Sequence, residues 1–387
     1  MIVAGHSTFC DSHKPPWGAF PRQNRIVDAQ SLGARRSREP LRIALLLPLS
    51  GPAGLWGPSC RTSALLAQRE INASGGLLGR EVALDFQDAG GAPDDVADAA
   101  FSLVEEDGAA AVVGMHISAV RLAVVRALDG RVPYVYTPVY EGGETSPGVF
   151  MTGETPSLQL RPAIHWLAER RAARRWYLVG TDYVWPRVSH RAARRYVKAS
   201  GGAIVGEEHL AFGADDFAPC LERIRLARPD AVLVSMVGGD CVAFNRAFAE
   251  AGFASDILRL SMASEENTLL GIGAENAENL FFSAGYLSAL RTPENLALLE
   301  RYRAAFGENA PVLNTIGQSC YEGLRLFAAM VQRAGALDVP SLTAASEGLA
   351  YSGPRGLVDV RRRHLRSAMY LAEADGLDFR ILERFTS

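Results

Sequence analysis

Cysteine is scarce in this chain of 387 residues, and its five cysteines are scattered. No two of them form a Cys-x-x-Cys pair, so their spacing matches neither a disulfide framework nor a zinc site. Scattered thiols fit a reducing compartment slightly better than an oxidising one. The alternative of one or two buried disulfide pairs remains open. Hydrophobic and charged contents of 48% and 21% are typical of a globular protein that needs no disulfides or metals to hold its core.

Long apolar runs and excess charge are also lacking. No run approaches the ~18 residues that a membrane span requires. The formal net charge of −3 creates no global positive field, so we expect no direct nucleic-acid binding. Residues 1–40 have no apolar core behind a basic start and do not resemble a secretory signal. We expect a flexible tail over 1–40 and a cytoplasmic location, or a periplasmic one if the start site is misassigned.

Motifs of catalysis and of nucleotide binding are absent. The chain has no G-x-G-x-x-G, no G-x-x-x-x-G-K-[ST], no G-x-S-x-G, no S-x-x-K and no H-E-x-x-H. The seven histidines do not cluster along the sequence, and Cys10 and His13 lie close together only in the expected tail. The sequence therefore predicts no catalytic residue, no cofactor and no metal site.

Short apolar runs alternate with amphipathic segments from residue 41 onward, which predicts α/β units with parallel sheets covered on both faces. The pattern restarts after "TGETPSL" (152–158), and further crossings between two units are expected near 283–288 and 350–355. We therefore predict one unit over 41–157 plus 286–350 and another over 158–285 plus 351–387. Alternating apolar residues after 355 predict short antiparallel strands at the end.

Aromatic and polar side chains gather in the loops that follow the predicted strands. Ligands bind beyond the carboxyl ends of the strands in an open parallel sheet, where rings exclude water and polar groups orient the ligand. A single aromatic there more often packs than binds, but six loops of this character favour a site for a small polar ligand. The candidate residues in these loops are Trp56, His116, Ser118, Tyr136, Tyr140, Tyr183, Trp185, Gly238 and Glu265.

Several of these loops resemble a known family. The stretches "LPLSGPAGLWGPS", "EINASGGLLGREV", "VGMHISAVRLAV", "YTPVYEGGETSPGVFMTG" and "GTDYVWPRVSH" are similar to motifs of the type I periplasmic-binding-protein family, which is Leu/Ile/Val-binding-like. The last two resemble its amide- and urea-binding branch, which includes regulators of aliphatic amidase expression and urea-binding components of ABC transporters. The resemblance implies two Rossmann-like lobes, a Venus-flytrap, joined by a three-strand hinge.

The resemblance also implies roles for individual residues. Ser118 and the neighbouring backbone would bind the ligand's amide or carboxylate end, and Tyr136, Thr137 and Pro138 would line the first lobe. Tyr183 and Trp185 would close from the second lobe, while Glu265 would meet an amino group in the amino-acid binders. His116 and Trp185 stand where the family's amide sensor has tyrosines, so the ligand's identity stays open.

These observations predict a non-catalytic protein that traps a small amide, urea-like compound or amino acid between its lobes. The closed form would be recognised either by ABC permease subunits or by a cytoplasmic regulator protein, and homo-oligomerisation stays open. The alternative is an α/β enzyme acting on a small amide. That alternative lacks any nucleophile–base motif, and its support is limited to acids near aromatics.

Overall fold

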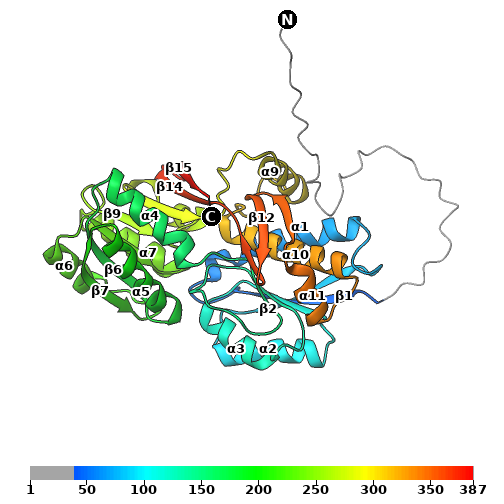
Figure 1. Cartoon of the computed structure of the whole chain (residues 1–387). Coiled ribbons are helices and arrows are strands. Elements are labelled where there is room, and N and C mark those ends of the chain that lie inside the picture. The colour runs from blue at the N-terminus through cyan, green and yellow to red at the C-terminus, as the bar shows by residue number, and fades with distance from the viewer. Residues whose placement is uncertain (1–38, 387) are drawn as a thin grey trace, which may run out of the picture.

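The computed structural model describes residues 39–386. The tail predicted over 1–40 therefore lies almost wholly outside the described residues. The described chain forms two lobes that lie side by side, with the early strands in one lobe and the middle of the chain in the other (Figure 1). None of the helices in the described part is long and apolar enough to cross a membrane.

Lobe one is built on an eight-stranded sheet. Strands β1 to β5 run parallel to one another. Strand β13 pairs parallel with β5, and β12 pairs antiparallel with both β11 and β13. In spatial order the strands are β11 (Ala350–Gly353), β12 (Gly356–Arg361), β13 (His364–Arg366), β5 (Val149–Met151), β4 (Tyr134–Tyr136), β3 (Ala111–Gly114), β1 (Leu41–Leu47) and β2 (Val82–Asp88).

Helices cover both faces of this sheet because its central strands are apolar on both sides. Alternate residues of β1 pack against different helices: Ile43 and Leu45 belong to the cluster with α1 and α10, while Ala44 and Leu46 pack with α2 and α3. The helices of lobe one are α1 (Gly57–Ala73), α2 (Pro93–Glu105), α3 (Ser118–Leu128), α9 (Pro293–Phe306), α10 (Thr315–Ala334) and α11 (Val339–Ser346), with the short η1 (Gly54–Trp56) before α1.

Lobe two repeats the plan with a seven-stranded sheet. Five strands are parallel, and β14 and β15 add an antiparallel edge. In order the strands are β15 (Asp378–Phe385), β14 (Met369–Asp375), β10 (Leu280–Ala284), β9 (Leu258–Ser261), β8 (Ala231–Ser235), β6 (Arg175–Thr181) and β7 (Ala203–Leu210). Its helices are α4 (Pro156–Arg170), α5 (Val184–Ala199), α6 (Ala218–Ala227), α7 (Gly238–Glu250), α8 (Glu266–Ile272) and η2 (Ala274–Asn276).

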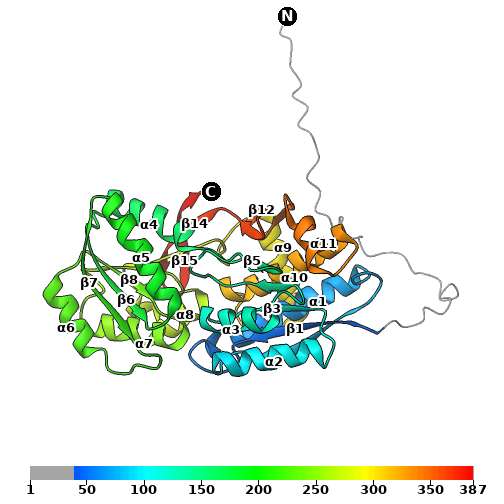
Figure 2. The same ribbon diagram turned by 60° about the horizontal axis from the view of Figure 1, so that its bottom comes forward.

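Three segments connect the lobes, as the turned view shows (Figure 2). They follow β5, β10 and β13. The third differs from the crossing near 350–355 that the sequence predicted. We expected residues 351–387 to belong with the second unit. Instead β11, β12 and β13 extend the first sheet, because Met151 of β5 pairs with His364 of β13, and the chain crosses only at 367–368.

Candidate functional site

The carboxyl ends of the parallel strands of both lobes face one closed cleft. The cavity left inside it measures about 20 Å³, close to the space that one water occupies. A larger hollow of about 500 Å³ opens beside α9, but none of the loops predicted to bind the ligand lines it. The cleft is lined by Trp56, Met115, His116, Ile117, Ser118, Tyr136, Pro138, Val139 and Ile316 of lobe one, and by Tyr183, Trp185, Val237 and Ala263 of lobe two.

The loop after β3 forms the floor of the cleft. His116 is buried, and its Nδ1 lies 3.2 Å from the carbonyl of Ile117. A carbonyl only accepts, so Nδ1 carries the proton and Nε2 accepts from the Tyr134 hydroxyl at 3.0 Å. Burial, with a smaller contribution from Arg121, lowers the pKa of His116 to about 4. The ring is therefore neutral at pH 7 and holds the loop rather than offering a charge.

Two polar atoms in the cleft make no hydrogen bond of normal geometry among the described residues, although burial raises the pKa of the Tyr136 hydroxyl and Ser118 lies close enough to it to offset part of this rise. They are Ser118 Oγ of lobe one and Trp185 Nε1 of lobe two, and both side chains are buried. Ser118 is the first residue of α3, and the preceding Ile117 provides no side-chain cap, so the first N–H groups of this helix are also available. A buried donor without a partner is costly unless a ligand satisfies it. These donors therefore suit an acceptor oxygen.

Lobe two contributes its aromatic wall from the turn between β6 and α5. Tyr183 packs on Trp185 with ring centroids 6.2 Å apart, and Phe212 backs Tyr183 at 5.1 Å. Gly180 lets the helix begin this close to the strand, because a Cβ there would lie 2.7 Å from Pro186. Burial raises the pKa of the Tyr183 hydroxyl, so it stays protonated. The turn predicted from "GTDYVWPR" is thus one wall of the cleft.

Three of the predicted ligand residues lie outside the cleft lining. Thr137 is buried and accepts from Ser319 at 3.1 Å. Tyr140 packs in the core of lobe one, with the Arg121 guanidinium over its ring at 5.6 Å. Gly238 contacts the other lobe: a Cβ there would lie 2.0 Å from the Pro52 carbonyl oxygen. These positions support the cleft and its closure.

Glu265 is also outside the lining, and its carboxylate is already satisfied. It accepts from Trp56 Nε1 of lobe one at 2.7 Å. It also caps α8 by accepting from the backbone of Asn267 and from the backbone and hydroxyl of Thr268. Burial, together with the neighbouring charge of Glu266, raises its pKa to about 7. Glu265 thus bridges the lobes, and the amino-group partner implied by the resemblance is engaged elsewhere.

One lining residue lay outside every loop that the sequence singled out. Ile316 stands in the first turn of α10, which follows the buried cap Asn314. Its helix begins some two hundred residues after the loop of Ser118, and an isoleucine in a helix carries no local signal of a site. Only the packing of α10 against β3 and β4 brings it to the cleft.

This two-lobed architecture, with strand ends meeting at a closed cleft, defines the class of two-domain binding proteins. Residues 40–378 match the family model described as periplasmic binding protein. The chain belongs to this family. It is 25% identical over 352 residues to Leu/Ile/Val-binding protein homolog 6 of Brucella melitensis, covering 87% of this chain and 88% of that protein.

Solved structures show the same fold. One is a solute binding protein of an ABC transporter from Rhodopseudomonas palustris, in complex with p-hydroxybenzoic acid, with a TM-score of 0.81 and 22% identity. The match covers 90% of this chain and 97% of that one. Another is the branched-chain amino acid transporter substrate binding protein LivJ of Streptococcus pneumoniae, in complex with isoleucine. It has a TM-score of 0.78 and 20% identity, over 89% and 99% of the two chains.

Proposed function

We propose that this protein is a solute-binding protein that traps a small ligand between its lobes and presents it to an ABC-type permease. The observation that carries the proposal is the pair Ser118 Oγ and Trp185 Nε1. These donors come from opposite lobes, are buried without partners and line the same cleft. A ligand that satisfies both stabilises the closed form over the open one, because it contacts both lobes only when they meet.

The lining restricts the ligand's chemistry. The two donors and the uncapped start of α3 suit a carbonyl or carboxyl oxygen, and the aromatic and aliphatic lining suits a flat apolar remainder. Because the cavity of about 20 Å³ holds only about one water, a ligand with such a remainder requires the lobes to lie further apart than they do in this structure. No described carboxylate lines the cleft, and Glu265 is engaged with Trp56, so a free ammonium group has no partner. We therefore propose a solute without an amino group. An amide fits better than an anion, because no cationic side chain lines the cleft and His116 is neutral.

Transport is favoured over sensing by the kind of protein that shares the fold. The Rhodopseudomonas structure is a solute binding protein of an ABC transporter. Cell fractionation tests this part of the proposal: recovery in the periplasm supports transport. Recovery in the cytoplasm in complex with a regulator protein would replace the permease by that regulator as the partner.

The ligand class is tested by calorimetry with a matched panel. Benzamide and benzoate have the same shape but differ in charge, and leucine and isoleucine carry the amino group. Urea and acetamide probe the smallest size. We expect amides to bind, carboxylates to bind more weakly and the amino acids not to bind. Binding of amino acids alone would contradict the proposed chemistry.

The enzyme alternative has a separate readout. Release of ammonia from the same amides, followed at high protein concentration, should not exceed that of buffer. Turnover that Ser118→Ala abolishes would overturn the binding-only proposal.

A further inference from the structure

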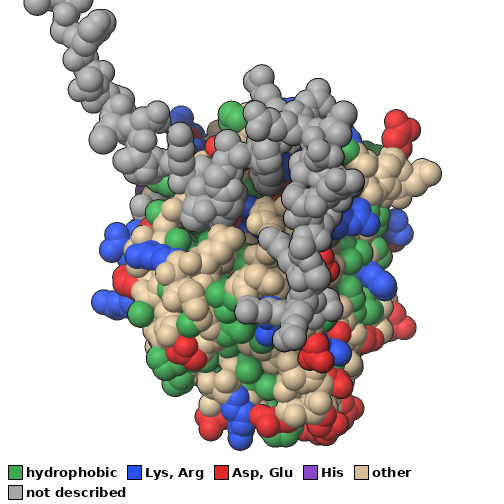
Figure 3. All heavy atoms as spheres, turned by 90° about the vertical axis from the view of Figure 1, so that its right-hand side faces the viewer, with side chains coloured by type: hydrophobic (Ala, Val, Ile, Leu, Met, Phe, Trp, Pro, Cys, Tyr) green, Lys and Arg blue, Asp and Glu red, His purple; other side chains and the backbone are tan. Residues whose placement is uncertain are grey.

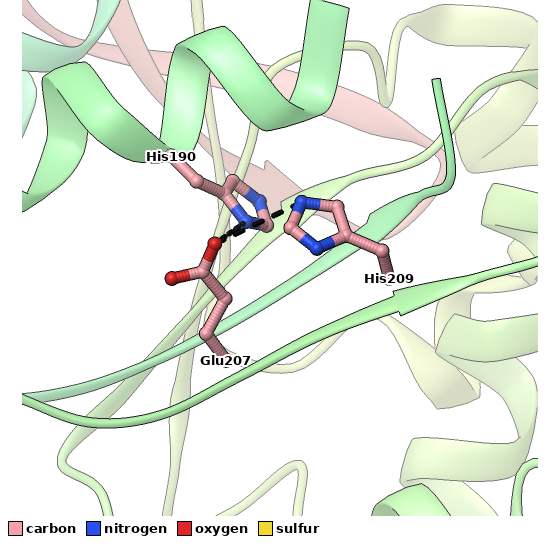
Figure 4. A group of neighbouring side chains, drawn as sticks. All are labelled: His190, Glu207 and His209. Atoms are coloured by element: carbon pink, nitrogen blue, oxygen red, sulfur yellow. Dashed lines mark hydrogen bonds and ion pairs between the residues drawn. The ribbon is translucent and has the colours of Figure 1, made fainter. Parts of the chain in front are cut away.

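Three side chains that are scattered in the sequence meet on lobe two, away from the cleft. His190 projects from α5, and Glu207 and His209 project from one face of β7, toward one another (Figure 4). His190 Nδ1 lies 3.3 Å from Glu207 Oε1, and His209 Nε2 lies 3.8 Å from the same oxygen. The imidazole centroids are 4.8 Å apart. Residues i and i+2 of a strand share a face, which explains why Glu207 and His209 of β7 both point toward His190.

The spacing matches a metal centre. Ligand atoms at about 2.0–2.2 Å from a tetrahedral zinc ion are roughly 3.3–3.5 Å apart. The distances of 3.3 and 3.8 Å to Glu207 are close to this value, and all three ligand atoms lie within 4.8 Å of one another. The bound of 4.8 Å exceeds the tetrahedral spacing, so the side chains have to move closer together to bind an ion. Two imidazoles and one carboxylate, with solvent as the fourth ligand, are a donor set that zinc accepts.

The Glu207 carboxylate has one oxygen available to the histidines. Arg194 pairs with Glu207 Oε2, whereas Oε1 faces both imidazoles.

Hydrogen bonding among the described residues leaves this cluster incomplete. His209 Nε2 is buried and makes no hydrogen bond among the described residues. A purely structural network of this kind would be expected to satisfy such atoms. His190 is fully buried, whereas Glu207 and His209 keep 16% and 12% of their side chains exposed. An ion therefore has access from the solvent side of β7.

We propose that His190, Glu207 and His209 form a binding site for a divalent transition metal ion of the zinc type. The ion would be held by His190 Nδ1, Glu207 Oε1 and His209 Nε2. It would tie α5 to the edge strand β7 of lobe two. This proposal is independent of the ligand proposed for the cleft, because none of the three residues lines it.

The test is equilibrium dialysis of the full chain, without a polyhistidine tag, against Zn²⁺ after treatment with a chelator. We expect one Zn²⁺ per chain and, with Co²⁺ in its place, the visible absorption of a tetrahedral site. His209→Ala should weaken Zn²⁺ binding by at least the roughly 10–100-fold that loss of a supporting residue costs. Glu207→Gln provides a second variant if circular dichroism shows that His209→Ala does not fold.

Two controls separate this site from other histidines. His165→Ala removes an exposed histidine beside Glu169 and should leave Zn²⁺ binding unchanged. The double variant Cys10→Ser/His13→Ala should also keep it. Zn²⁺ binding that is substoichiometric, or that survives both His209→Ala and Glu207→Gln, would overturn the proposal and leave the cluster as an ion-pair network around Arg194.

Discussion

At the scale of single residues, the cleft is defined by what its polar atoms lack. Ser118 Oγ and Trp185 Nε1 are buried in it without partners, whereas His116, Glu265 and Thr137 have theirs. Residue type alone would favour His116 and Glu265 over Ser118 and Trp185 as ligand contacts. The hydrogen bonds reverse this order, because a side chain that is already paired has little left to offer a ligand.

Ser118→Ala should weaken binding of the best panel ligand by roughly tenfold, since one hydrogen bond contributes about 0.5–1.5 kcal/mol. Thermal stability without ligand should change little, because the hydroxyl makes no hydrogen bond of normal geometry. Ser63→Ala is the matched control: Ser63 Oγ is also buried without a partner, but it lies on α1 outside the cleft. Calorimetry that gives equal affinities for the two variants would show that Ser118 does not contact the ligand.

Glu265 should make stability fall as pH rises between about 4.3 and 7. Its pKa is about 7 in the folded protein and about 4.3 when unfolded. The unfolded chain therefore loses this proton at lower pH than the folded chain does. The free energy of unfolding falls by roughly 2–4 kcal/mol between these two pH values. Glu265→Gln should remove this term. The buried histidines have the opposite dependence, so the measurement is the difference between the urea-unfolding curves of the two proteins at each pH. A constant difference would contradict the assigned shift.

At the scale of elements, a buried ion pair ties together the segments that connect the lobes. Glu154 follows β5, and its carboxylate accepts from Gly285, which follows β10, at 3.1 Å. The same carboxylate pairs with Arg355 at 2.8 Å. Arg355 is almost completely buried and also lies 4.0 Å from Glu322. One charge network thus links the segments of the first two crossings.

Glu154→Gln should lower the free energy of unfolding by about 3 kcal/mol, because it leaves a buried guanidinium short of a charge partner. The exposed pair of Asp359 and Arg366 provides the control. There Asp359→Asn should cost no more than about 1 kcal/mol. Urea unfolding measures both. Equal effects would indicate that water reaches Arg355 and that the pair at the hinge is not buried in solution.

The sequence predicted the local strands and helices well but misplaced one group of strands between the lobes. The alternation of apolar runs and amphipathic segments that was predicted from residue 41 onward is confirmed by strand and helix pairs such as β6 and α5, because apolar runs bounded by helical patterns have few alternatives. The placement of residues 351–366 was wrong. The sequence pattern of an antiparallel hairpin is the same whichever sheet it joins. Only the pairing of β13 with β5 assigns these hairpins to the first sheet.

At the scale of the whole molecule, the two lobes meet at a contact that only glycine allows. Gly238 has φ of +49°, and the next residue, Gly239, donates its N–H to the Pro52 carbonyl of lobe one at 3.0 Å. A side chain at Gly238 would push the lobes apart. On the outer end of lobe one, acidic and basic side chains both occur across the visible face (Figure 3). That face shows no dominance of one charge where it is uncovered.

Gly238→Ala should therefore weaken ligand binding by tenfold or more while each lobe stays folded. Gly252→Ala is the control, since Gly252 has φ of +79° and open space at its Cβ position. Both variants carry the strain of a left-handed backbone, of order 1–3 kcal/mol, but only Gly238→Ala obstructs closure. Small-angle scattering with ligand should give a larger radius of gyration for Gly238→Ala. Equal radii and affinities for the two variants would show that this contact is not part of closure.

The sequence by itself determined the α/β class, the order of strands and helices, and the loops at the strand ends, because local periodicity and turn residues encode them. It could not determine which side chains of those loops remain unpaired, because partners such as Trp56 for Glu265 lie about two hundred residues away. The same holds for Ile316 in the cleft and for the cluster of His190, Glu207 and His209. These features depend on distances between elements that are remote in sequence, and only the tertiary structure decides such distances.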